Sequence, residues 1–211
     1  MGRDRRIDAP GVIYHVGAKG NRGCRIYADD YERRVFLWLL GRVTKRYGWI
    51  CQSYCLMTNH YHLVVQLSER GLSDGMRELN GGFSRFTNAR HGLEGHLFRN
   101  RFWSDPILDE ARMFATARYV VLNPVRAGLC LLPEEWRWSS YRACAGLDFA
   151  PPFLALAEHL EHFGRTPAEA QHAFREFVRN GIGEQRPRGR AWVSDTVTKG
   201  ARETARGADA R

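Results

Sequence analysis

The sequence predicts an α+β fold in which a small antiparallel sheet packs against helices. Segments with strand-like alternation are interspersed with segments of helical periodicity between residues 11 and 123. Hydrophobic residues make up 44% and aromatic residues 12% of the 211 residues, which is enough apolar side chain for one core of ordinary size. The apolar run at residues 35–40 is far shorter than the roughly 18 residues that a membrane span needs, so we expect no such span.

The first half of the chain predicts one strand, one helix and a strand pair. Residues 11–16 are β-branched and aromatic, follow a proline and precede a turn-rich segment, which is typical of a strand. Asp29 and Asp30 are candidate N-caps of a helix that Gly48 ends. Residues 49–54 and 55–67 are strand-like, with turn formers near 57–59, and should pair antiparallel.

The next segments predict two further helices around one strand. Apolar residues at alternating steps of four and three indicate a helix at residues 73–90, although Gly75, Gly81 and Gly82 weaken it. The aromatic residues 96–108 form one strand or a short hairpin. Asp109 caps the following helix, and Pro124 should end it because proline disfavours helical geometry in the residue before it.

The resulting order, β-α-β-β-α-β-α, contains the split β-α-β arrangement of ferredoxin-like folds. We expect this domain to occupy residues 1–145 and a helical extension to occupy 146–180, with short helices at 153–163 and 167–178 that cover the open sheet edge. Residues 181–211 are rich in Gly, Arg, Pro, Thr and Ala, which predicts a disordered basic tail.

The charge balance favours a polyanionic partner. Lys and Arg number 32 against 23 Asp and Glu, and only three of the cations are lysines. An arginine-rich coding bias is the alternative. Candidate DNA contacts are the arginines on the second helix, near the aromatic segment and ahead of the first strand: Arg77, Arg85, Arg99, Arg101, Arg3, Arg5 and Arg6. A solvated helix face and a plain basic terminus are the competing interpretations.

Cysteine usage and the N-terminus favour a cytoplasmic protein. The five cysteines include no CxxC pair, so we expect free packed thiols and neither a disulfide framework nor a zinc site. The first residues carry charge without an apolar stretch behind them, which argues against a secretory signal.

His60 and His62 are the first candidate site residues. Side chains alternate along a strand, so His60 and His62 point to the same face about 6.6 Å apart along the backbone, and their imidazoles can hold one divalent ion, while Tyr61 faces the core. Tyr119 and Asn123 lie one helical turn apart on one face and are candidate neighbours of that ion. Ordinary packed histidines, a core tyrosine and an asparagine chosen to precede Pro124 remain the alternatives.

Five segments in order resemble a known family: PGVIYHVGAKGNRG, RYGWICQSYCLMTNHYHLVV, GHLFRNRF, RYVVLNPVRAGL and WRWSSYRA. Over residues 3–145 the chain resembles the bacterial single-tyrosine transposases of the HUH superfamily, in particular the branch associated with repetitive extragenic palindromes. The resemblance implies a ferredoxin-like domain, a divalent ion held by a histidine pair and a helical tyrosine that attacks single-stranded DNA.

By this resemblance His60 and His62 are metal ligands, Tyr119 is the nucleophile and Asn123 is an amide ligand, although Asn123 can equally serve to end the helix. Tyr61 and Thr58 depart from the aliphatic residue and the proline that the family usually has. Imidazole and oxygen ligands suit Mg²⁺ or Mn²⁺. The implied product is a 5′-phosphotyrosyl link with a free 3′-OH.

The implied partner is single-stranded or hairpin DNA, and a homodimer that exchanges tyrosine helices remains open. One rival interpretation is a domesticated protein that binds structured DNA without transposition. The other is an RNA-binding ferredoxin-like module, because such sheets can present aromatic side chains to bases.

Overall fold

The computed structural model describes residues 9–69 and 71–183. The predicted DNA contacts Arg3, Arg5 and Arg6 and most of the predicted tail at 181–211 lie outside the described residues. In chain order the strands and longer helices are β1 (Ile13–Lys19), α1 (Asp30–Tyr47), β2 (Trp49–Leu56), β3 (His60–Leu67), α2 (Leu72–His91), β4 (Trp103–Ile107), α3 (Glu110–Arg126), α4 (Tyr141–Cys144), α5 (Leu156–Leu160) and α6 (Pro167–Arg179).

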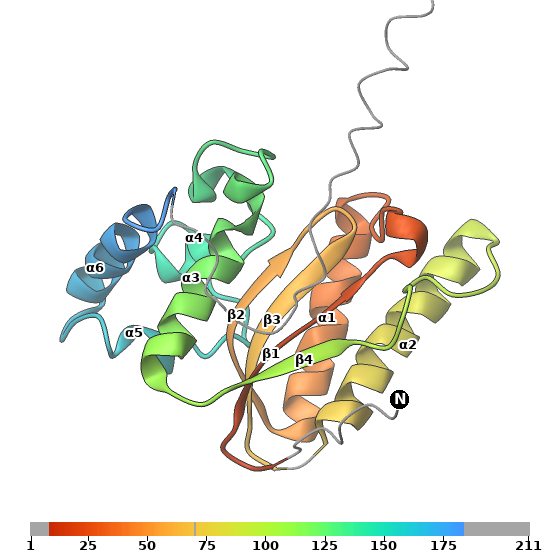
Figure 1. Cartoon of the computed structure of the whole chain (residues 1–211), viewed down its shortest axis with the longest axis horizontal. Coiled ribbons are helices and arrows are strands. Elements are labelled where there is room, and N and C mark those ends of the chain that lie inside the picture. The colour runs from red at the N-terminus through yellow and green to blue at the C-terminus, as the bar shows by residue number, and fades with distance from the viewer. Residues whose placement is uncertain (1–8, 70, 184–211) are drawn as a thin grey trace, which may run out of the picture.

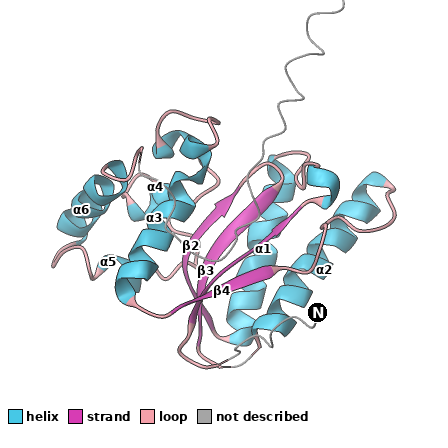
Figure 2. Cartoon of the chain, in the orientation of Figure 1, coloured by secondary structure: helices cyan, strands magenta, loops and turns pink. Residues whose placement is uncertain are grey.

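The predicted ferredoxin-like arrangement is confirmed. The sheet has the order β2-β3-β1-β4, and every neighbouring pair is antiparallel. Helices α1 and α2 lie side by side on one face of the sheet, whereas α3 and the C-terminal helices lie on the other (Figure 1). Figure 2 shows the four strands as the layer between these two groups of helices.

Strand alternation divides the buried side chains into two clusters. Tyr14, Val16 and Leu63 point to the α1 and α2 side, where they join Phe36 and Phe83 in the larger cluster. The smaller cluster lies between the sheet and α3; its members are Cys55, Met57, Val64, Ile107, Met113, Tyr119 and Val120. The second cluster places Tyr119 against the sheet, because α3 turns that residue inward.

The helix ends of α1 follow the sequence closely. The Asp29 side chain accepts a hydrogen bond from the Glu32 backbone N–H, and Gly48 adopts the left-handed conformation that closes the helix. The glycines of α2 do not interrupt the helix, which runs from Leu72 to His91. Packing against the sheet requires at least one of them. A Cβ atom on Gly75 would lie 2.3 Å from the indole ring of Trp49, so the strand can approach the helix only at a glycine.

The predicted end of α3 at Pro124 is wrong, since the helix continues to Arg126 with Pro124 inside it. Proline removes one N–H donor, but its fixed φ is compatible with a helix. The bonds after it are kept: Ala127 N–H donates to Asn123 O and Leu129 N–H donates to Pro124 O. Asn123 therefore lies within the helix and does not end it.

The C-terminal segments cover the edge of β2, as expected. Leu154 bridges Cys51, and Ser139 bridges Cys55 on the same strand. The predicted helix at 153–163 is shorter, spanning only Leu156–Leu160. Helix α6 packs on the outer side of α3, where the Arg118 guanidinium lies 4.6 Å from the centre of the Phe177 ring. The C-terminal extension at residues 146–180 thus packs against α3, the helix that carries Tyr119.

The cysteines and the helix lengths bear on two expectations from the sequence. All five cysteines are free, although Cys24 is exposed and Cys130 is half-buried instead of packed inside. Across residues 9–69 and 71–183, none of the helices is both long and apolar enough to cross a membrane.

Candidate active site

Strands β1 and β3 bring two histidines to the α3 face of the sheet. His62 of β3 lies across from Gly17 of β1, and His15 lies across from Val64, so the two side chains project on the same side. Tyr61 projects to the opposite side, is fully buried, and donates a 2.6 Å hydrogen bond to Asn80 Oδ1. This separation agrees with the expectation that Tyr61 belongs to the core.

The candidate nucleophile and the histidine pair come together in one chain. The centre of the Tyr119 ring lies 5.8 Å from that of His62 and 6.1 Å from that of His15. The His60 and His62 rings are 4.9 Å apart and nearly perpendicular. Tyr119 is 4% exposed, so the phenol is enclosed between α3 and the sheet.

His15 is a site residue that the sequence did not reveal. It is completely buried, and its Nε2 lies 3.0 Å from Nδ1 of His62. Burial, and secondarily the positive charge of Arg112, hold the pKa of His15 well below its usual value. His15 is therefore neutral at pH 7 and can accept a hydrogen bond from His62. Alternation along β1 was the available indication, but it becomes informative only with the register against β3.

The Nδ1 atoms of His60 and His62 each take part in a hydrogen bond with a neighbouring side chain. Nδ1 of His60 lies 2.7 Å from Asn59 Oδ1, which can only accept, so Nδ1 carries the hydrogen. Nδ1 of His62 lies 3.0 Å from Nε2 of His15, and either ring can donate this hydrogen bond, depending on its tautomer. In the arrangement where neutral His15 accepts, the His60 and His62 rings both carry the lone pair on Nε2, and histidines that ligate metals are commonly fixed by such a bond from the second nitrogen.

Helix α3 supplies further polar groups around Tyr119. Asn123 is 2% exposed, and its Nδ2 donates a 3.1 Å hydrogen bond to the backbone carbonyl of Tyr119. This bond uses the amide nitrogen, whereas a metal ligand would be the amide oxygen. The Arg126 guanidinium lies 5.1 Å from the centre of the Tyr119 ring, a cation–π position. Arg126 was not singled out from the sequence.

Strand β4 adds a ring and an ion pair. The Trp103 ring lies 4.7 Å from His15 and 5.6 Å from His62. Asp105 lies opposite His15 in the sheet and accepts a 2.7 Å hydrogen bond from Arg112 at the start of α3. This pair fixes the first turn of the tyrosine helix to the sheet.

Residues 13–121 match the sequence model of the family described as "Transposase IS200 like". The chain belongs to this family. It is 23% identical over 162 residues to a putative REP-associated tyrosine transposase of Haemophilus influenzae, covering 72% of this chain and 92% of that protein. A solved REP-associated tyrosine transposase bound to a REP hairpin superposes with a TM-score of 0.60 at 19% identity, covering 72% of this chain and 93% of that one.

His60 and His62 would offer two imidazole nitrogens to a divalent ion of the Mg²⁺ or Mn²⁺ type in this IS200-like transposase, and Asn123 stays a candidate third ligand. Two imidazole nitrogens and an amide oxygen suit Mn²⁺, and oxygen atoms of a bound phosphate suit both ions. Within the described ranges, no group of three or more His, Cys, Asp or Glu side chains is arranged to hold a metal.

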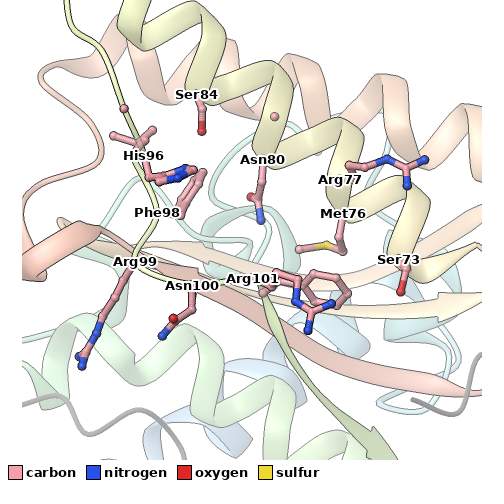
Figure 3. Close-up of a pocket in the computed structure, with 14 residues that line it drawn as sticks. Ser73, Met76, Arg77, Asn80, Ser84, His96, Phe98, Arg99, Asn100 and Arg101 are labelled. Atoms are coloured by element: carbon pink, nitrogen blue, oxygen red, sulfur yellow. The ribbon is translucent and has the colours of Figure 1, made fainter. Parts of the chain in front are cut away.

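Three of the arginines predicted to contact DNA lie together around a pocket on the other side of the sheet. Arg77 of α2 and the loop residues Arg99 and Arg101 line this pocket, which Figure 3 shows. Arg85 lies next to it on α2, where its Nη1 would be 3.4 Å from a Cβ atom on Gly81. The structure thus groups four of the seven predicted arginines.

Proposed function

We propose that this transposase cleaves and rejoins single-stranded DNA beside a hairpin through a covalent link to Tyr119. The observation that carries the proposal is the placement of the Tyr119 ring within about 6 Å of the His62 ring, on the sheet face where His60 and His62 lie side by side. A nucleophile, a candidate metal site and a cation beside the phenol therefore meet in one chain.

The chemistry is a transfer between two oxygens. The Tyr119 hydroxyl oxygen attacks the phosphorus, the bond from phosphorus to the 3′-oxygen breaks, and the phenolic proton ends on the leaving 3′-hydroxyl. The products are a 5′-phosphotyrosyl link and a free 3′-OH. One phosphodiester replaces another, so reversal on a second strand needs no ATP.

The side chains around the phenol address its weak nucleophilicity. A tyrosine with a pKa near 10 is mostly protonated at pH 7, so a group that stabilises the phenolate speeds attack. Arg126 lies beside the ring and is placed for that role. His60 Nε2, His62 Nε2 and Asn123 Oδ1 are the atoms that would hold Mg²⁺ or Mn²⁺, which offsets negative charge on the phosphate.

DNA must reach an enclosed hydroxyl. Because Tyr119 is only 4% exposed, the side chains around it have to rearrange before a phosphate contacts its oxygen. The first turn of α3 is fixed by Arg112 and Asp105, and its outer side is covered by α6. We therefore expect side-chain movement at the sheet edge, with α3 itself staying in place.

The nature of the DNA is inferred from charge and similarity. The net charge of +9 favours a phosphate backbone, and the solved relative is bound to a REP hairpin. The tyrosine and both histidines come from one chain, which supports a site that functions without exchange of helices in a homodimer.

The two alternative functions predict structural features that differ from those of this chain. A ferredoxin-like module that reads RNA presents an open sheet face, whereas helices cover both faces of this sheet in the described part of the chain. A domesticated DNA-binding protein needs no intact nucleophile, and Tyr119 is retained beside the histidine pair. Strand transfer is therefore favoured over both.

Covalent capture tests the proposal. Labelled hairpin DNA with single-stranded flanks is incubated with Mn²⁺, and protein and DNA are separated under denaturing conditions. We expect a DNA adduct that Tyr119→Phe abolishes, because that substitution removes one oxygen and keeps the ring. Tyr31→Phe, at a tyrosine that is 51% exposed, is the matched control and should leave the adduct unchanged. A binding protein or an RNA module would yield no adduct with any variant.

A further inference from the structure

A second concave site lies on the α2 side of the sheet edge, away from the histidines. It is a cavity of about 640 Å³ between α2 and residues 95–102, which lead into β4. Cavities of this size are typical of sites that enclose small molecules. In Figure 3 side chains from the helix and from the loop face each other across the opening.

The lining combines rings, amides and cations. Phe98 is half-buried and supplies apolar surface, whereas Met76 and Phe102 lie behind it at 0% and 7% exposure. Arg77, Arg99 and Arg101 are exposed around it, although Arg77 is paired with Asp74 at 2.8 Å. None of the described residues that line the cavity is acidic. Aromatic surface together with guanidinium groups is the combination that binds bases and phosphates of single strands.

Asn80 gives the cavity an oriented polar group. Its Oδ1 accepts the 2.6 Å hydrogen bond from the buried Tyr61 hydroxyl, which leaves the Nδ2 amide as the end that faces the opening (Figure 3). An amide fixed in this way is a donor of defined direction, and base edges carry acceptors for such donors. A site for a backbone phosphate alone would not require an aromatic side chain in its lining.

The loop that forms one wall connects the cavity to the active site. Arg99 N–H donates to Lys19 O and Asn21 N–H donates to Leu97 O, so the loop continues along the end of β1. Arg101 lines the cavity, and two residues later Trp103 contacts His62 on the other face. A strand of DNA bound at His62 can therefore reach this opening around the β4 edge.

We infer that the cavity holds one unpaired nucleobase of the DNA, adjacent to the phosphate at the histidine and tyrosine site. This inference rests on the proposed function for the identity of the ligand. The base stacks on Phe98 and accepts a hydrogen bond from Asn80, while the loop arginines contact the flanking phosphates. The cavity thus helps to choose which phosphate of a flexible strand is presented to Tyr119.

Gly81 allows the cavity to be filled without disturbing the core. A Cβ atom on Gly81 would have only Arg85 Nη1 near it, at 3.4 Å, and Gly81 lines the cavity. Gly81→Leu therefore places a side chain in the opening and removes no charge. Ala89→Leu is the matched control, because Ala89 is exposed on the same helix and does not line the cavity.

The test measures the fluorescence of a base analogue placed at successive positions of the DNA. Full-length protein is used in EDTA, so that binding is measured without the covalent step. 2-Aminopurine replaces one base at a time in a DNA hairpin with mixed-sequence single-stranded flanks. We expect a change in emission on binding at one or two flank positions only. Gly81→Leu should abolish that change and weaken binding by about tenfold, a typical contribution of one stacked base, whereas Ala89→Leu should match the unchanged protein.

The outcomes separate this inference from the proposed function. An equal response at every position, no response at any position, or an unchanged response in Gly81→Leu would overturn the inference, even if Tyr119 captures DNA. A positional response that only Gly81→Leu removes would support it, even if no covalent adduct forms.

Discussion

The hydrogen bond between His15 and His62 predicts that a residue outside the histidine pair controls metal binding. His15→Phe keeps a ring of similar shape in the buried position but removes the hydrogen-bond partner of His62 Nδ1. Leaving a buried donor unpaired costs about 1–3 kcal/mol, and the fixed tautomer of His62 is lost with it. Removing such a supporting bond typically lowers metal affinity by about 10- to 100-fold.

Calorimetric titration with Mn²⁺ in the absence of DNA measures this effect. We expect the dissociation constant to rise by about 10- to 100-fold in His15→Phe. His15→Gln should recover much of the affinity, because its amide oxygen reaches near the place of Nε2 and accepts the same bond. Hairpin binding in EDTA should be equal in all three proteins, since phosphate contacts supply most of that affinity. Unchanged Mn²⁺ affinity in a folded His15→Phe protein would refute the reasoning.

Three further predictions concern the metal, the DNA and the extension. The double variant His60→Ala with His62→Ala should lose Mn²⁺-dependent cleavage but retain much of its DNA binding; retained cleavage would reject these ligands. Removing Arg3, Arg5 and Arg6 should weaken hairpin binding and make it less sensitive to salt, as filter binding at several salt concentrations can measure. Burial lowers the pKa of His159 to about 4, so folding stability should fall between pH 6.5 and pH 4, where the unfolded chain binds the proton and the folded chain does not. His159→Leu should remove about 2 kcal/mol of the stability loss between pH 7 and pH 5, as melts at the two pH values can measure, and an equal loss in both proteins would contradict the assignment.

The fold was largely predictable because its elements have local determinants. Alternation and helical periodicity differ along the chain, and α1 is bounded by Asp29 and Gly48, whose capping roles can be inferred from neighbouring residues. The order of these elements then limits the topology to very few arrangements. The end of α3 was missed because Pro124 costs one hydrogen bond, which the surrounding packing of a long helix can offset.

The site was predictable only in part, because its contacts join distant segments. His60 and His62 share a face by alternation, and Tyr119 precedes Asn123 by one turn, but nothing local shows that Tyr119 lies beside the histidines. The contribution of His15 depends on the register of β1 against β3, and that of Asp105 depends on its partner Arg112 in the next helix. The cavity beside α2 likewise needs the path of residues 95–102, which have no periodicity of their own.

The identity of the residue that becomes linked to DNA tests the proposed mechanism most directly. Hairpin DNA is captured with Mn²⁺, the product is digested with nuclease and protease, and the peptide that retains a nucleotide is sequenced by mass spectrometry. We predict a single modified residue, Tyr119, joined to a 5′-phosphate, with an equal amount of free 3′-OH on the released strand. An adduct on any other of the eight tyrosines, or cleavage that leaves no protein attached to the DNA, would contradict the mechanism.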